Sequence, residues 1–199
     1  MVAVAVLGVP RSGTSLVAGL LHALGVCMGQ EWLLMPDPSW QPKCTYVDRE
    51  LNALHDRMMT GREAVYGMDV CPEARADYHK ALARRDAEHA HWGVKCHDLP
   101  FVWRHFVAGV SAQVVLVRTS RPDKESRDSL EARCGDRDIG PWLKAVESVC
   151  AEFAGPVHTV AFTDAIRNPR ETVARLADFA GVPYRADAAL LVQPEWKRF

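Results

Sequence analysis

The sequence predicts a three-layer α/β domain, in which a mainly parallel sheet is flanked by helices on both faces. Two apolar runs, at 2–7 and 112–118, lack polar alternation, which is typical of strands buried on both faces. Segments with helical spacing separate the strand candidates, and strands that alternate with helices build parallel sheets. The length of 199 residues suits one domain spanning 1–199, and the chain contains no repeats.

The first half of the chain is expected to contain one buried strand and three helices. Gly25 is a typical stop for the first helix, because glycine adopts the left-handed conformation at helix ends. Leu51, Leu54 and Met58 recur at helical spacing, which predicts a second helix. In order, we expect a strand at 2–7, a helix at 16–24, a long irregular segment at 26–43, a helix at 48–59 and a polar outer helix at 73–90.

Prolines and apolar runs define the elements of the second half. Pro122 and Pro169 predict helix starts, because the missing N–H of proline is tolerated in the first turn. Val173, Leu176 and Ala180 lie on one face of the last predicted helix. In order, we expect a strand at 92–96, a helix at 101–107, a strand at 112–118, a helix from Pro122, a helix at 142–153, a strand at 157–162 and a helix from Pro169 to Gly181.

Composition and charge exclude several classes of protein. Hydrophobic residues make up 48% and charged residues 25% of the chain, which excludes a disordered, collagen-like or coiled-coil protein. The 24 basic and 25 acidic side chains nearly balance, which argues against nucleic-acid binding through broad phosphate neutralisation. We therefore expect no nucleic-acid partner, and any anionic ligand must be held by a local cluster of cations.

Cysteine spacing and hydropathy favour a cytoplasmic protein. The six cysteines include no Cys-x-x-Cys pair and no His/Cys spacing typical of zinc, so neither a metal site nor a disulfide scaffold is expected. Scattered thiols are typical of a reducing compartment. Because no apolar run is long enough to span a membrane or to act as a signal peptide, we expect no membrane contact.

The segment from Gly8 to Ser15 joins the first strand to the first helix and has the form of a phosphate cradle. Backbone N–H groups at a helix N-terminus point toward an anion, and the helix dipole adds partial positive charge. The spacing of Gly8 and Gly13 matches the nucleotide P-loop, although Thr14 replaces the lysine of that motif. Arg11 supplies a cation earlier in the loop. We therefore expect an anion site here and not an ordinary glycine turn.

The end of the second buried strand argues against magnesium chemistry. An enzyme that uses a nucleoside triphosphate needs an acidic residue for Mg²⁺, usually at the end of a neighbouring buried strand. The apolar run at 112–118 ends in Arg118 instead. This arrangement favours an anionic donor that is handled without a metal.

These residues resemble those of the sulfotransferase family that uses 3′-phosphoadenosine 5′-phosphosulfate (PAPS). The loop resembles the family's 5′-phosphosulfate loop, which implies that it binds the donor through Pro10, Arg11, Ser12, Gly13, Thr14 and Ser15. The family also has an arginine at a strand end and a serine eight residues later, which together hold the 3′-phosphate. Arg118 with Ser126 fits this spacing, and so does Arg121 with Ser129. The first pair is preferred because Arg118 directly follows the apolar run.

Two later segments extend the resemblance. Lys95-Cys-His-Asp-Leu-Pro100 resembles the family's Lys-Thr-His-Leu-Pro segment, which implies that His97 is the general base and that Lys95 assists it. The ordinary pKa of histidine suits a base near neutral pH. The segment 162–169 resembles the family's Tyr-Glu-Asp-Leu…Pro pattern, with Thr163 at the position of its first acidic residue.

The middle of the chain, 26–91, does not match the family clearly. Asp48, Glu50 and Asp98 therefore stay open as alternative bases, and the acceptor cannot be read from the sequence. Candidates to line an acceptor pocket are Trp32, Met35 and Trp40.

The resemblance implies transfer of a sulfonate group from PAPS to a hydroxyl or amine of a small-molecule or carbohydrate acceptor, with release of 3′-phosphoadenosine 5′-phosphate (PAP). Arg11 and the loop amides would stabilise the negative charge that develops at the 5′-phosphate. No metal is required. Two alternatives remain open: a P-loop kinase or NTPase, and a sulfotransferase-like protein that binds nucleotide without catalysis.

Overall fold

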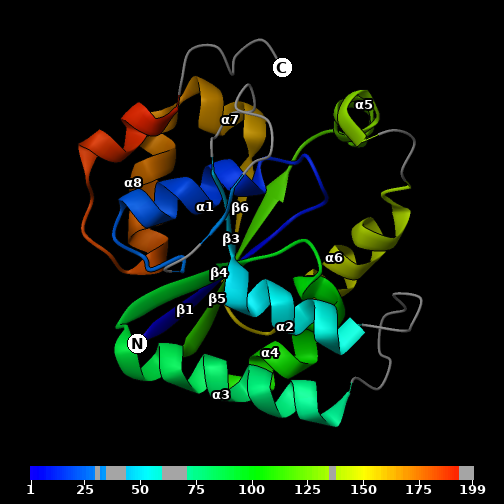
Figure 1. The fold of residues 1–199 in the computed structure, drawn as a ribbon. Coiled ribbons are helices and arrows are strands. Elements are labelled where there is room, and N and C mark those ends of the chain that lie inside the picture. The colour runs from blue at the N-terminus through cyan, green and yellow to red at the C-terminus, as the bar shows by residue number, and fades with distance from the viewer. Residues whose placement is uncertain (30–31, 35–43, 60–70, 135–137, 193–199) are drawn as a thin grey trace.

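The computed structural model describes residues 1–29, 32–34, 44–59, 71–134 and 138–192, and Figure 1 shows their arrangement. Four strands form one sheet in the order β4-β1-β5-β6, and every neighbouring pair is parallel. This confirms the α/β fold class. The strands are β1 (Val2–Leu7), β4 (His91–Lys95), β5 (Gln113–Ser120) and β6 (Val157–Ala161).

The register of the sheet places the carboxyl ends of three strands around one point. β1 is central, and its partners at the carboxyl end are Lys95 for Val6 and Arg118 for Leu7. Residues 3–7 of β1 are at most 1% exposed, as expected for an apolar strand covered on both faces. The loop that follows β1 therefore begins beside the ends of β4 and β5.

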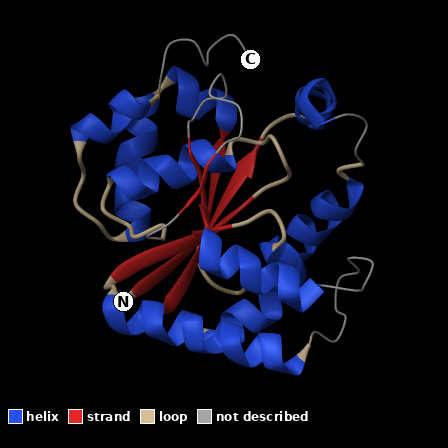
Figure 2. Ribbon diagram, in the orientation of Figure 1, coloured by secondary structure: helices blue, strands red, loops and turns tan. Residues whose placement is uncertain are grey.

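Helices cover both faces of the sheet, which gives the expected three layers (Figure 2). On one face, Val4 and Val6 pack with α1 (Thr14–Ala23) and α8 (Pro169–Ala180). On the other, Ala3 and Ala5 belong to a second core that includes residues of four helices. These helices are α2 (Arg49–Met59), α3 (Pro72–Glu88), α4 (Trp103–Gly109) and α6 (Gly140–Glu152).

Several elements were not expected from the sequence. The stretch read as irregular contains β2 (Trp32–Leu34), which pairs antiparallel with β3 (Cys44–Asp48). The predicted strand at 157–162 ends one residue early, because Phe162 begins a short helix, α7. The remaining elements are the 3-10 helices η1 (Leu99–Val102) and η2 (Ala186–Leu191), and the helices α5 (Asp123–Cys134) and α7 (Phe162–Arg167).

The polar helix α3 lies on the outside of the molecule in Figure 1, as expected, but it is not polar all round. Its buried positions recur at helical spacing and include two charged residues. They are Ala74, Tyr78, Ala81, Leu82, Arg85 and Asp86. Within the described residues, no helix is both long and apolar enough to cross a membrane.

Candidate phosphate-binding site

The loop between β1 and α1 contains two residues with left-handed backbone conformation. Arg11 has φ 71° and Gly13 has φ 97°. Such turns can direct successive N–H groups into an anion-binding concavity, and the N-terminus of α1 adds partial positive charge. Positive φ is unfavourable for an arginine, and strained residues of this kind are concentrated at functional sites. The loop therefore has backbone conformations that are typical of anion-binding turns.

Hydroxyl groups behind the loop fix its shape. Thr119 Oγ1 donates to the carbonyl of Leu7 (3.3 Å) and accepts a hydrogen bond from Ser12 Oγ (2.7 Å). The Ser12 N–H donates to the carbonyl of Val9 (3.1 Å). A Cβ on Gly8 would lie 2.1 Å from Thr119 Oγ1, so only glycine fits there. Both polar groups of Ser12 are thus engaged within the protein.

The free N–H groups of the site come from the start of α1. The first N–H groups of a helix have no intrahelical acceptor, and this applies to Thr14 and Ser15. Thr14 is buried and Ser15 is half-buried. Pro10 has no backbone N–H to donate to an anion. Among the residues assigned to donor binding, Gly13, Thr14 and Ser15 are therefore the ones whose amides suit an anion.

Arg121 and Ser129 lie beside the loop. Arg11 Nε donates to Ser129 Oγ (3.2 Å), and Arg121 donates to the carbonyl of Arg11 (3.4 Å). Arg121 Nε also donates to Glu125 (3.0 Å). Ser129 of α5 and Arg121, which lies two residues before α5, are in this way attached to Arg11 of the loop.

Arg118 occupies a different position. β5 continues to Ser120, so Arg118 lies inside the strand, opposite Leu7, and Arg121 is the first residue beyond it. Burial raises the pKa of the Cys150 thiol in α6, and the charge of Arg118 opposes this shift, which locates Arg118 toward α6. Ser126 is fully buried, and its Oγ has no hydrogen-bond partner among the described residues. In that part of the chain, no hydrogen bond joins Arg118 to Ser126.

His97 lies near two cations at the carboxyl end of β4. Lys95 ends the strand and is 2% exposed, and His97 follows two residues later. Burial holds the pKa of His97 well below its ordinary value, and the charges of Lys95 and Arg11 lower it further. His97 Nδ1 is buried without a hydrogen-bond partner among the described residues. A neutral imidazole is therefore the stable form at neutral pH, and a neutral imidazole can accept a proton.

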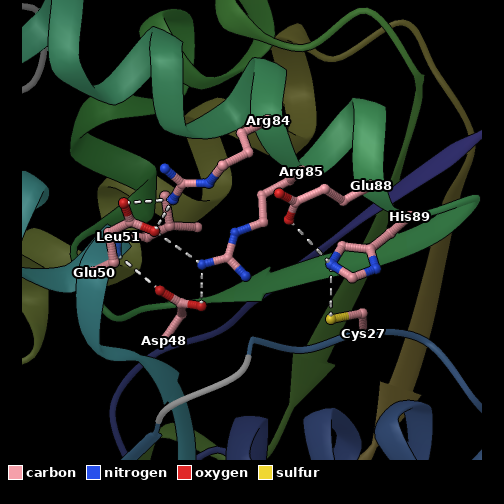
Figure 3. Close-up of polar contacts among 8 residues, drawn as sticks. All are labelled: Cys27, Asp48, Glu50, Leu51, Arg84, Arg85, Glu88 and His89. Atoms are coloured by element: carbon pink, nitrogen blue, oxygen red, sulfur yellow. Dashed lines mark hydrogen bonds and ion pairs between the residues drawn. The ribbon is translucent and has the colours of Figure 1, made fainter.

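The alternative bases Asp48 and Glu50 lie in an ion-pair network (Figure 3). Asp48 accepts hydrogen bonds from the Leu51 N–H (2.9 Å) and from Arg85 (2.7 Å). Glu50 accepts from Arg84 (2.6 Å) and from Arg85 (3.2 Å). The hydrogen bond from Arg84 is the main reason why the pKa of Glu50 is lowered. Both carboxylates thus join α2 to α3, and Asp48 also caps α2.

Asp98 is the third of the alternative bases. Burial raises the pKa of Asp98, which follows His97. In the ranges that the structure describes, no group of three or more His, Cys, Asp or Glu side chains could hold a metal ion. Trp32, Met35 and Trp40, the candidates for an acceptor pocket, have side chains outside the described residues.

Phe162 is the contact that the sequence did not indicate. A Cβ on Gly13 would lie 2.6 Å from Phe162 Cδ2, so the ring lies against the loop. The guanidinium of Arg121 lies over the same ring, 4.8 Å from its centre. The position of Phe162 in the sequence could have indicated this contact. Phe162 directly follows an apolar strand, and the carboxyl end of that strand lies at the same edge of the sheet as the loop.

Two solved structures of sulfotransferase domains are similar to this chain. The sulfotransferase domain of the Synechococcus PCC 7002 olefin synthase aligns with a TM-score of 0.58 and 17% identity, over 99% of this chain and 79% of that one. The sulfotransferase domain of the curacin biosynthetic pathway aligns with a TM-score of 0.58 and 13% identity, over 98% and 79%. A gluconokinase from Sinorhizobium meliloti 1021 aligns with a TM-score of 0.48 and 19% identity, over 90% and 93%.

These similarities concern the fold. No family model matches the sequence, and no curated protein matches it either. The chain has an α/β fold with a parallel sheet of four strands flanked by helices, similar to the fold of the two sulfotransferase domains.

Proposed function

We propose that this protein transfers a sulfonate group from PAPS to a hydroxyl or amine of a small-molecule or carbohydrate acceptor. One observation carries the proposal: the loop after β1, in which Arg11 and Gly13 have positive φ, begins beside the end of β4, where Lys95 pairs with Val6 and His97 follows two residues later. The lowered pKa of His97 leaves its imidazole unprotonated, as a general base must be, and the two cations suit the negative charge that develops on a phosphate.

The residues of the site fit an adenosine phosphosulfate. The amides at the start of α1 and the charge of Arg11 suit the 5′-phosphate. For the 3′-phosphate, the contacts of Arg121 and Ser129 with Arg11 favour this pair over Arg118 and Ser126. When bound, PAPS supplies an activated sulfonate whose leaving group is the 5′-phosphate of PAP.

His97 takes the proton of the acceptor in this proposal. As the acceptor oxygen or nitrogen forms its bond to sulfur, the bond between sulfur and the bridging oxygen breaks, and the electron pair stays with the 5′-phosphate. Arg11 and Lys95 stabilise the charge that develops on that oxygen. Because the pKa of His97 is lowered, its imidazole is unprotonated at neutral pH, which is the state that a general base needs.

Calorimetry of the full chain with PAP tests donor binding. We expect binding without Mg²⁺, and His97→Gln should keep PAP binding while losing turnover of labelled PAPS with an acceptor panel of sugars, phenols and amines. Absence of PAP binding by the wild-type chain would contradict the proposal. PAP binding with no turnover on any acceptor would favour a non-catalytic nucleotide-binding protein.

A P-loop kinase is the second candidate, and the spacing of Gly8 and Gly13 favours it. It predicts ATP binding that depends on Mg²⁺ and that EDTA abolishes. The same calorimetric experiment with ATP, with and without Mg²⁺, separates the two functions.

A further inference from the structure

The two left-handed residues of the phosphate loop are each covered by one side chain from another part of the fold. The carbonyl of Arg11 (φ 71°) accepts a hydrogen bond from Arg121 (3.4 Å). Gly13 (φ 97°) lies against the ring of Phe162, because a Cβ at Gly13 would be 2.6 Å from Phe162 Cδ2. The residues that cover the loop follow β5 and β6, which are neighbours in the sheet.

Arg121 is itself held from several sides. Its side chain is only 7% exposed, its Nε donates to Glu125 (3.0 Å), and its guanidinium lies 4.8 Å from the centre of the Phe162 ring. A guanidinium on an aromatic face is attracted by the ring, more strongly where water is excluded. Arg121 and Phe162 therefore form one stacked unit, which contacts the loop at Arg11 and at Gly13.

A strained backbone persists only where its surroundings over-determine it. The positive φ of Arg11 is unfavourable for a residue with a Cβ, so the loop would relax if its contacts were removed. Relaxation would turn the N–H groups at the start of α1 away from a common point. The stacked pair thus stabilises the conformation in which the loop can hold an anion.

We propose that Arg121 and Phe162 are positioning residues, which clamp the phosphate loop in its anion-binding conformation from the outside. The part of the test below that measures nucleotide binding rests on the proposed function. For Arg121, this role is separate from any contact with a 3′-phosphate. A clamp acts on every ligand whose phosphate occupies the loop, whereas a 3′-phosphate contact acts only on ligands that carry one.

Calorimetry of the full chain with AMP and with PAP distinguishes the two roles, because AMP lacks the 3′-phosphate. Arg121→Met should weaken AMP binding roughly tenfold, the effect of one lost hydrogen bond to a charged group. Phe162→Leu, which removes no phosphate ligand, should also weaken AMP, and Phe162→Tyr should restore it. Unchanged AMP affinity in Arg121→Met and Phe162→Leu would overturn the clamp. The matched control is Lys124→Met, which removes an exposed cation of α5 three residues after Arg121.

Amide hydrogen exchange of residues 8–15 tests the clamp without any ligand. We expect roughly tenfold faster exchange in Arg121→Met and Phe162→Leu than in the wild type and in Lys124→Met. Equal exchange rates in all four proteins would overturn the inference. Failure of the wild type to bind either nucleotide would refute the proposed function, and the exchange rates would still decide the clamp. If Arg121→Met does not fold, Arg121→Lys, which keeps the charge but not the planar stacking, replaces it.

Discussion

Two regions of this molecule differ in the groups that lie beside their positively charged side chains. In the ion-pair network of α2 and α3, Arg84 and Arg85 contact carboxylates, and the hydrogen bond from Arg84 lowers the pKa of Glu50. At the phosphate loop, Arg11 and Lys95 lie near an imidazole and oppose its protonation. Opposite charges stabilise each other in the first region, whereas positive groups gather in the second.

This difference distinguishes charged residues that stabilise the fold from charged residues that we expect to act in binding and catalysis. The network joins α2 to α3, whereas the positive groups at the loop lie beside the N-terminus of a helix, whose backbone N–H groups favour an anion. The network can therefore be expected to affect stability, and the loop can be expected to affect binding and catalysis. The following predictions test this division.

The largest effect is expected at Arg85. Arg85→Met would leave the carboxylate of Asp48 buried, with an exposed fraction of 3%, and without its partner. Removing one partner of a buried ion pair lowers the free energy of unfolding by about 3–5 kcal/mol. Urea unfolding measures this loss. PAP affinity below the unfolding transition should match the wild type, and a parallel loss of affinity would contradict the separation of the two regions.

The next largest effect is expected at Arg11. Asparagine tolerates positive φ, so Arg11→Asn removes the charge and retains the backbone conformation. We expect kcat/KM with PAPS to fall by about 10²–10³-fold, the typical effect of one removed charge-stabilising group, with little change in stability. Steady-state kinetics and urea unfolding are the measurements. Arg175→Asn, in the exposed part of α8, is the matched control.

The pH dependence of the reaction should report on Lys95. A base must be unprotonated, and the pKa of His97 is lowered, so activity should be retained on acidification until well below the ordinary pKa of histidine. Lys95→Met removes one charge that opposes protonation, so the acidic limb of the kcat/KM profile should move to higher pH. A limb that stays in place in this variant would argue against His97 as the base.

The smallest effect on the free energy of unfolding is expected at Glu50, in the exposed part of the ion-pair network of α2 and α3. The pair of Arg84 and Glu50 is exposed, with 49% and 42% of the two side chains accessible. Exposed pairs contribute about 0–1 kcal/mol, so Glu50→Gln should lower the free energy of unfolding by less than about 1 kcal/mol. Turnover should be unchanged. A large loss of turnover would return Glu50 to the list of candidate bases.

The continuous patterns of the sequence predicted the centre of the fold. The apolar run of 2–7 and the glycine spacing after it depend on local chemistry alone, and both are found at the expected place. β3 could not be predicted, because it is stabilised by pairing with β2 across a stretch of chain. The buried stripe of α3 was present in the sequence at helical spacing, but Arg85 within it looked like a surface residue.

The preference for Arg118 over Arg121 as a residue that holds the 3′-phosphate depended on where β5 ends. The apolar side chains stop at Val117, and the sequence therefore predicted a strand at 112–118 that ends in Arg118. In the structure, backbone pairing with β6 continues β5 to Ser120, which makes Arg121 the first residue beyond it. Hydrogen bonds to a neighbouring strand do not require apolar side chains, so hydropathy alone misplaces such an end. The contact of Phe162 with the loop is likewise set by tertiary structure.

The central position of β1 has a consequence for how the protein folds during its synthesis. Its strand partners, β4 and β5, leave the ribosome about 90 and about 110 residues after Val2. An apolar strand therefore stays without its strand partners while about 90 further residues are made, and its pairing must close long loops, which slows folding. The loop after β1, which begins beside the ends of β4 and β5, takes its final surroundings only after β5 has been made, although β1 is almost fully buried in the folded protein.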